Sequence, residues 1–198
     1  IKNHGAKSVV GIDIESLVIQ RANELAVKYN LSNLAHFRCV KPGPLDIPDE
    51  SVDLVFSKEV FLHISNKDDL MKDIYRVLKP GGLVVVSDWM RIDDNPPSKQ
   101  MQEYIAAEGL DMYMCSLKRY EQALKNAGFI DIVMKDRNVW YLNKAQQELA
   151  AIEGPLNKKV IDAIGPEETA GAIDIWKKLI GVLEIGEHRP GHFKAAKK

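Results

Sequence analysis

The stretch Lys7–Ser16, with the sequence KSVVGIDIES, decides the fold. Its first part, Ser8–Asp13, is a short apolar run rich in β-branched residues, which is typical of a buried parallel strand. The run ends in an acid, and an apolar pattern with helical spacing follows at once over Glu15–Tyr29. This order is typical of the second strand of a nucleotide-binding α/β domain. We therefore expect the first strand of the sheet, and the glycine-rich turn after it, to be missing from this chain.

Strands and helices alternate along the rest of the chain, which predicts right-handed crossovers and a largely parallel sheet. Further strands are expected at His36–Val40, at Val52–Ser57 and at Leu83–Ser87, then within residues 127–136 and within residues 189–198. A helix is expected over Asp68–Leu78, and two helical segments over about 91–127 and 143–186, each interrupted by glycine. Residues 1–198 are expected to form a single α/β domain.

Composition indicates an ordinary globular protein and excludes several classes of partner. The chain has 198 residues, of which 45% are hydrophobic and 28% charged, and its net charge is −1. This balance gives no reason to expect nucleic acid or a membrane surface as a partner. Cys39 and Cys115 have no neighbours at metal-ligand spacing, so we expect reduced thiols, no metal site and a cytoplasmic location.

In a parallel sheet the ligand lies beyond the carboxyl ends of the strands, and in this chain those ends carry polar residues. Asp13 fits the acid that accepts hydrogen bonds from both ribose hydroxyls of a nucleotide, and Ile14 fits an apolar wall beside the adenine ring. Val40, Lys41 and Ser57 end the next two strands and complete the predicted cofactor site. The alternative for Asp13 is a cap for the helix that follows it.

Two longer segments together are much more specific than any of these pieces. They are PDESVDLVFSKEVFLHI, residues 48–64, and YRVLKPGGLVVVSDW, residues 75–89. With them the chain resembles the class I S-adenosylmethionine-dependent methyltransferases, and within these the phosphoethanolamine N-methyltransferases. The segments MQEYIAAEGLD, LKNAGFIDIVMKDR and GHFKAAKK are also similar. The glycine, sarcosine and dimethylglycine methyltransferases are the next most similar group.

The resemblance implies a Rossmann-like sheet with its first strand missing and a helical insertion before the last strand. It also implies that the helical segments over about 91–127 and 143–186 cap the substrate. It implies S-adenosylmethionine as cofactor and a small amine as substrate. His63 falls on the family's catalytic histidine, which helps to remove the amine proton; an imidazole that titrates near neutral pH suits this task. The alternative for His63 is a polar residue that caps the next helix.

The substrate site implied by the resemblance includes Glu59, Trp89, Tyr104 and Glu108. Glu59 stands where the family has an aspartate that contacts the amine, Trp89 replaces a tyrosine of the site, and Tyr104 matches a substrate-site tyrosine. Trp89 keeps an aromatic wall for a methylated cation. These four positions would surround a small cation.

The residues that hold the substrate phosphate in the family are not kept. Glu108 stands at the position of an arginine, Leu110 at that of a tyrosine and Leu179 at that of a lysine. An acid and two leucines cannot supply the charge-assisted donors that a phosphate dianion needs. Lys177, Lys178 and Tyr113 lie close in sequence and are the alternative donors. We expect an amine without a phosphate group.

A further departure is Lys41, which stands where the family has an aspartate that accepts the adenine amino group. Lysine only donates hydrogen bonds, so its side chain cannot take that role. Adenine would then be held by the neighbouring backbone, with Val40 against the ring. An exposed loop lysine beside Pro42 is the alternative interpretation.

We consider two hypotheses about function, one for an enzyme and one for a non-catalytic protein. The first is an S-adenosylmethionine-dependent N-methyltransferase of a small amine, or a fragment of one. The second is a non-catalytic module that keeps the fold, has lost cofactor binding, and forms a homodimer through exposed strand edges. The missing glycine-rich turn and Lys41 favour the second hypothesis for this polypeptide. The segment SKEVFLHI favours the first for the full-length parent protein, of which we expect this chain to be a fragment.

Overall fold

A computed structural model describes residues 1–198. The chain divides into two compact units, residues 1–44 and residues 45–198. Each unit is described by itself below. The single domain expected over residues 1–198 stays a prediction.

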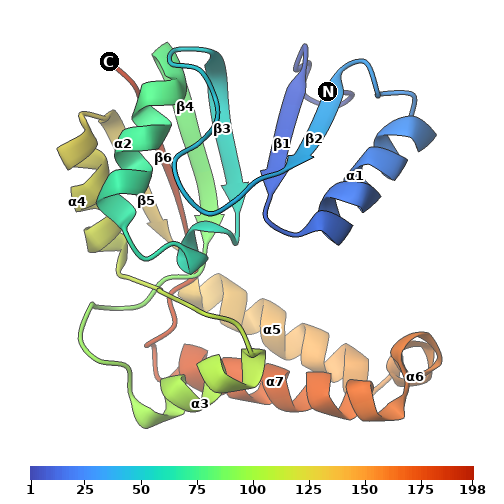
Figure 1. Cartoon of the computed structure of the whole chain (residues 1–198). Helices are drawn as coiled ribbons and strands as arrows, with labels where there is room; N and C mark the ends of the chain where they lie inside the picture. The colour runs from blue at the N-terminus through green and yellow to red at the C-terminus, as the bar shows by residue number, and fades with distance from the viewer. The chain divides into compact units, whose positions relative to one another are not determined.

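The first unit is a strand–helix–strand unit (Figure 1). Strand β1, Val9–Asp13, pairs in parallel with strand β2, Ala35–Cys39, and helix α1, Ser16–Lys28, connects them. The two strands and the helix predicted for this region are thereby confirmed. Gly11 in the middle of β1 is required by packing, because a Cβ atom added there would lie 2.4 Å from Cδ1 of Phe37 on β2.

The second unit is organised around a four-stranded sheet in the order β3-β4-β6-β5. Its strands are β3, Val52–Lys58; β4, Leu78–Asp88; β5, Ile130–Asp136; and β6, Gly191–Ala196. Strands β3 and β4 are parallel, whereas β6 runs antiparallel to both of its neighbours. Strand β4 begins before the predicted Leu83, because Leu78 already pairs with Val52. The predicted α/β fold is confirmed, and β6 accounts for its antiparallel part.

Two helices cover one face of this sheet: α2, Lys67–Val77, and α4, Leu117–Ala127 (Figure 1). Helix α4 lies at the end of the helical segment expected over about 91–127. Its residues Tyr120 and Leu124 are fully buried in the core between helices and sheet, so this part of the segment packs on the sheet. The physical reason is a new helix start, since the Ser116 Oγ accepts a hydrogen bond from the Arg119 N–H at 3.0 Å and begins α4 there.

The remaining helices form a second group beyond the carboxyl ends of β3 and β4 (Figure 1). They are α3, Lys99–Glu108; α5, Asn138–Glu153; α6, Asn157–Ile164; and α7, Pro166–Glu184. Helices α3, α5 and α7 contribute to a second apolar core, which has Leu62, Met101, Leu179 and Leu183 among its buried members. Helix α5 begins at Asn138 rather than near residue 143, because Asn138 packs in a buried position and its side chain donates to the carbonyls of Leu183 and His188.

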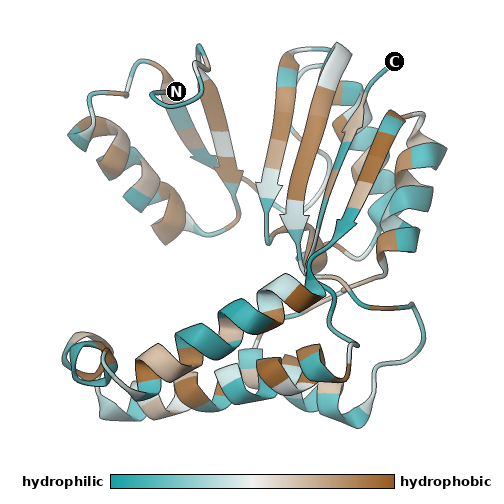
Figure 2. Cartoon of the chain, turned by 180° about the vertical axis from the view of Figure 1, so that it is seen from behind, coloured by the Kyte–Doolittle hydropathy of each residue, from teal (hydrophilic) through white to brown (hydrophobic).

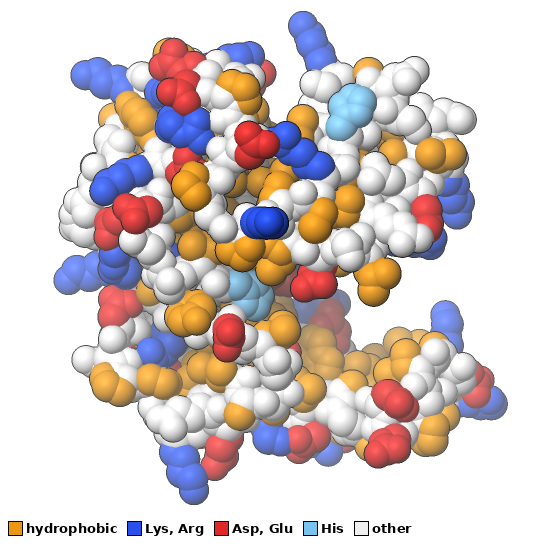
Figure 3. Space-filling view, viewed as in Figure 1, with side chains coloured by type: hydrophobic (Ala, Val, Ile, Leu, Met, Phe, Trp, Pro, Cys, Tyr) orange, Lys and Arg blue, Asp and Glu red, His pale blue; other side chains and the backbone are white.

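The face of the four-stranded sheet that is turned away from α2 and α4 has hydrophobic residues along β3 and β4 (Figure 2). On β3, Leu54 is 53% and Phe56 is 68% exposed. Strand β3 also has a single hydrogen-bonded neighbour, β4, so one of its edges is open. None of the helices has the length and apolar character that crossing a membrane requires. Acidic and basic side chains are mixed over the surface that Figure 3 shows.

Candidate functional site

The carboxyl ends of β3 and β4 place two of the predicted site residues next to each other. Glu59 directly follows β3, and its N–H donates to the Ser87 carbonyl on β4 at 2.8 Å. Its backbone is left-handed, with a φ of 54°, a conformation that residues other than glycine rarely adopt. Trp89 directly follows β4. The sheet therefore presents a carboxylate and an indole at the same end of adjacent strands.

Helix α3 brings the other two predicted substrate residues to this place. Tyr104 and Glu108 are four residues apart and so lie on the same face of the helix. The Tyr104 ring is fully buried, and its centroid lies 6.2 Å from that of Trp89. Burial, followed by the nearby carboxylate of Glu108, holds the pKa of Tyr104 above its usual range, and Glu59 acts in the same direction. The four residues therefore form one acidic and aromatic cluster.

The structure adds two residues to this cluster that the sequence did not single out. Burial raises the pKa of Tyr141 on α5 to about 12, and the carboxylate of Glu59 adds to the shift. His188 is fully buried against Trp89, at 5.4 Å between ring centroids with an interplanar angle of 88°, and lies 5.7 Å from Tyr104. Burial lowers the pKa of His188 to about 3, so this imidazole is neutral at physiological pH. No pattern could have found His188, since it lies in a loop before the last strand.

His63 ends a short turn of 3₁₀ helix, η1, over Phe61–His63, which begins two residues after Glu59. Its Nδ1 lies 2.7 Å from the Asp111 carbonyl oxygen. Because a carbonyl only accepts, Nδ1 must carry the proton, and in the neutral ring Nε2 then carries the free lone pair. The cap of helix α2 is Asn66, whose side chain accepts from the Asp69 N–H at 3.1 Å. His63 is therefore a side chain with a fixed tautomer and does not cap the next helix.

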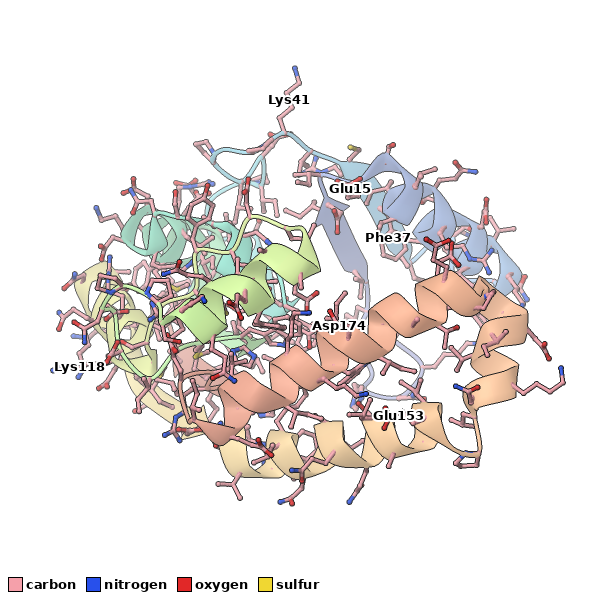
Figure 4. All side chains as sticks on the ribbon, turned by 90° about the horizontal axis from the view of Figure 1, so that it is seen from below. Glu15, Phe37, Lys41, Lys118, Glu153 and Asp174 are labelled. Atoms are coloured by element: carbon pink, nitrogen blue, oxygen red, sulfur yellow. The ribbon has the colours of Figure 1, made fainter.

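None of the positions proposed for phosphate binding offers a free cation. Leu179 is 3% exposed and packs in the second apolar core. The Lys177 ammonium lies 2.8 Å from Glu153 on α5, and the Lys178 ammonium bonds to Asp174 on α7. Figure 4 labels the two acids. Leu110 and Tyr113 are half exposed, at 56% and 50%. Both lysine charges are thus offset by acids at the surface.

In the first unit, the predicted cofactor residues lie where β1 and β2 end. Asp13 is partly buried, and its Oδ1 accepts a hydrogen bond at 2.9 Å from the N–H of Glu15, the residue before α1. Ile14 is 57% exposed beside it. The Val40 N–H donates to the Asp13 carbonyl at 2.9 Å. Lys41 is exposed, and its side chain points away from the ribbon (Figure 4).

The residues at the ends of β1 and β2 fit the ribose and the adenine ring of the implied cofactor better than the adenine amino group. The Oδ2 of Asp13 can accept from a ribose hydroxyl, and the exposed Ile14 offers an apolar surface to a base. Lys41 cannot accept from an adenine amino group through its side chain. In the second unit, Ser57 is buried on β3, and its hydroxyl has no hydrogen-bond partner.

Comparisons with known proteins agree with this architecture. Residues 1–86 match the family model described as a methyltransferase domain. The chain is 32% identical over 189 residues to the phosphoethanolamine N-methyltransferase of Triticum aestivum, covering 96% of this chain and 36% of that protein. The chain thus spans little more than a third of the length of that relative.

Solved structures give the same result. Phosphoethanolamine N-methyltransferase 2 of Haemonchus contortus, in complex with phosphomonomethylethanolamine and S-adenosylhomocysteine, has a TM-score of 0.86 and 24% identity and covers 96% of this chain and 44% of its own. The same protein with S-adenosyl-L-methionine has a TM-score of 0.84 and 25% identity, with coverages of 96% and 43%. The matched domain, the relatives and the fold together support a class I S-adenosylmethionine-dependent methyltransferase that is similar to the phosphoethanolamine N-methyltransferases.

Proposed function

We propose that this chain is the part of an S-adenosylmethionine-dependent N-methyltransferase that selects a small amine without a phosphate group. The observation that carries this proposal is the cluster of Glu59, Glu108, Trp89 and Tyr104 at one end of the four-stranded sheet. Two carboxylates beside aromatic faces are suited to attract a small cation. Leu179 carries no charge, and Lys177 and Lys178 are each paired with an acid. Both observations support a substrate that carries no phosphate.

His63 would remove the proton that keeps an amine from reacting. A protonated amine has no lone pair, so it must lose a proton before it can attack a methyl group. The bond from His63 Nδ1 to the Asp111 carbonyl leaves Nε2 as the acceptor for that proton. The carboxylates of Glu59 and Glu108 would hold the protonated amine near the turn until the proton leaves.

Asp13 and Ile14 would hold the ribose and adenine of the cofactor, as their carboxylate and apolar surfaces allow. S-adenosylmethionine supplies the methyl group, on a positively charged sulfonium, when it is bound. A relative that is 25% identical has been solved with S-adenosyl-L-methionine, which supports this cofactor. With Lys41 exposed, the adenine amino group would depend on backbone acceptors.

Calorimetric titration of the 198-residue chain with S-adenosylmethionine and S-adenosylhomocysteine tests cofactor binding. Methyl transfer to ethanolamine, glycine and phosphoethanolamine then tests the substrate. We expect transfer to an amine without phosphate and a rate at least about tenfold lower with phosphoethanolamine, since a dianion meets carboxylates rather than charge-assisted donors. A preference for phosphoethanolamine would contradict the proposed substrate class. No cofactor binding at millimolar concentration would contradict an active enzyme for this chain.

The contribution of Glu108 can be isolated on its own helix. Glu108→Gln keeps the shape of the side chain and removes its charge, so the KM for the amine should rise about tenfold with little change in the Kd for the cofactor. Glu103→Gln is the matched control, because Glu103 lies on the same helix, is 57% exposed and is 3.7 Å from the Lys99 ammonium. Equal effects of the two substitutions would contradict a role for Glu108 in binding.

The second hypothesis, a non-catalytic module that self-associates, is favoured by one observation. The open edge of β3 carries the exposed Leu54 and Phe56. Apolar open edges are sites where a second chain adds. Cofactor binding without methyl transfer to any amine, or no cofactor binding at all, would favour this alternative.

A further inference from the structure

Lys67 is a charged side chain buried to an unusual degree, at 2% exposure. Lysine is almost never fully buried unless its ammonium is paired. This lysine lies on the first turn of α2, four residues after His63. Burial lowers the pKa of Lys67, so keeping it there costs free energy that its contacts must offset.

The contacts of Lys67 are made with the turn that carries His63. Its ammonium donates to the Phe61 carbonyl at 2.7 Å and also to the Ile64 carbonyl. These two carbonyls flank His63 along the chain. Two of the three N–H donors of one lysine therefore fix the backbone on both sides of the proposed base.

The same turn is held from its other side by the segment after α3. The Tyr113 N–H donates to the Leu62 carbonyl at 2.7 Å, and the Asp111 carbonyl accepts from His63 Nδ1 at the same distance. A rotation of the turn would break the bond that sets the tautomer of His63. The backbone of residues 61–64 must therefore stay in place for Nε2 to remain the proton acceptor.

A buried partner compensates the charge of Lys67. Asp88, which is 1% exposed at the end of β4, attracts the ammonium and accepts a hydrogen bond from the Tyr120 hydroxyl at 2.6 Å. The ammonium also lies 5.5 Å from the centroid of the Tyr120 ring. Lys67, Asp88 and Tyr120 thus form a buried cluster beneath the turn, and none of them is exposed to a substrate.

We propose that Lys67, buried beside the Tyr120 ring, is a positioning residue that locks the His63 turn and so keeps His63 in the tautomer with its proton on Nδ1. The value of this tautomer for proton removal rests on the proposed function. The locking itself does not, because it is a statement about hydrogen bonds within this chain.

Nitrogen NMR of the ¹⁵N-histidine-labelled chain reports the tautomer directly, and His63→Asn assigns the signal. The wild type should show His63 with its proton on Nδ1. In Lys67→Met, which keeps an apolar side chain of similar length without donors, this single tautomer should be lost. Amide exchange at His63 and Ile64 should become at least about tenfold faster. Lys72→Met is the matched control, since Lys72 lies on the same helix with a side chain 63% exposed.

An unchanged tautomer and unchanged exchange in folded Lys67→Met would overturn the proposal. Should that variant not fold, Lys67→Gln is measured in the same way. Its shorter neutral amide reaches at most one of the two carbonyls, so at least one amide of the turn should exchange faster. Exchange rates equal to those of the wild type would then overturn the proposal. Both readouts are independent of methyl transfer, so a failed activity assay leaves this test intact.

Discussion

At the scale of single residues, the site combines a strained backbone with a buried carboxylate. Glu59 holds a left-handed backbone directly after β3, at a cost of about 1–2 kcal/mol for a residue with a Cβ. Conformations of this kind concentrate at functional sites, where the surrounding structure enforces them. Here the bond from the Glu59 N–H to the Ser87 carbonyl helps to hold this backbone conformation at the end of the sheet.

Asp88 gives a prediction about pH. Burial raises the pKa of Asp88 to about 6 from its ordinary 3.8. The folded state therefore binds this proton more tightly than the unfolded state. As a consequence, the contribution of Asp88 to the free energy of unfolding rises as the pH falls from above 6 towards 4. Removing the group by Asp88→Asn should make the slope of unfolding free energy against pH more positive, by about 1 kcal/mol per pH unit near pH 5.

Urea unfolding of the wild type and Asp88→Asn between pH 4.5 and 7.5 measures the two slopes. Asp53→Asn is the control, because the Asp53 side chain is 85% exposed. Parallel slopes in wild type and Asp88→Asn would mean that Asp88 does not titrate in this range in the folded chain.

At the scale of elements, one serine decides which layer a helix joins. Ser116 is 3% exposed, and its Oγ accepts from the Arg119 N–H and donates to Asp94 Oδ2 at 2.8 Å. This cap ends the segment that follows α3 and starts α4, so that Tyr120 and Leu124 face the sheet. Helices α3 and α4 are close in sequence but belong to two different cores.

Ser116→Ala should lower the unfolding free energy by about 1–2 kcal/mol, because it removes a buried helix cap and the hydrogen bond that the Ser116 hydroxyl donates to Asp94. Urea unfolding followed by circular dichroism measures the change. Ser98→Ala is the comparison at the start of α3, where the Ser98 Oγ caps the Met101 N–H at 3.2 Å in a more exposed setting and should cost less. A smaller loss in Ser116→Ala than in Ser98→Ala would contradict the importance given to the buried cap.

At the scale of the whole molecule, the two sheets leave edges without partners. Strand β3 pairs only with β4, and β1 pairs only with β2. Backbone donors and acceptors on such an edge are free to pair with another strand, and apolar side chains beside them add to the attraction. On β3 these side chains are Leu54 and Phe56.

We expect the chain to self-associate through β3 at micromolar concentration, and Phe56→Lys to shift it towards the monomer by placing a charge on the edge. Sedimentation velocity over a range of concentrations measures both. Val139→Lys is the matched control, because Val139 is 71% exposed but lies on helix α5 rather than on a strand. A chain that stays monomeric up to about 100 micromolar would contradict self-association through the open edge of β3.

The sequence by itself determined the order of strands and helices, the family, and the residues at the strand ends. Those features depend on local patterns: apolar runs such as Ser8–Asp13, and polar residues where the runs stop. Only the tertiary structure decided that α4 packs on the sheet, that Tyr141 and His188 join Trp89, and that Lys67 bonds to the carbonyls beside His63. The physical reason is that burial and pairing arise between segments far apart in the sequence, and a lysine on an amphipathic helix looks exposed until its partners are known.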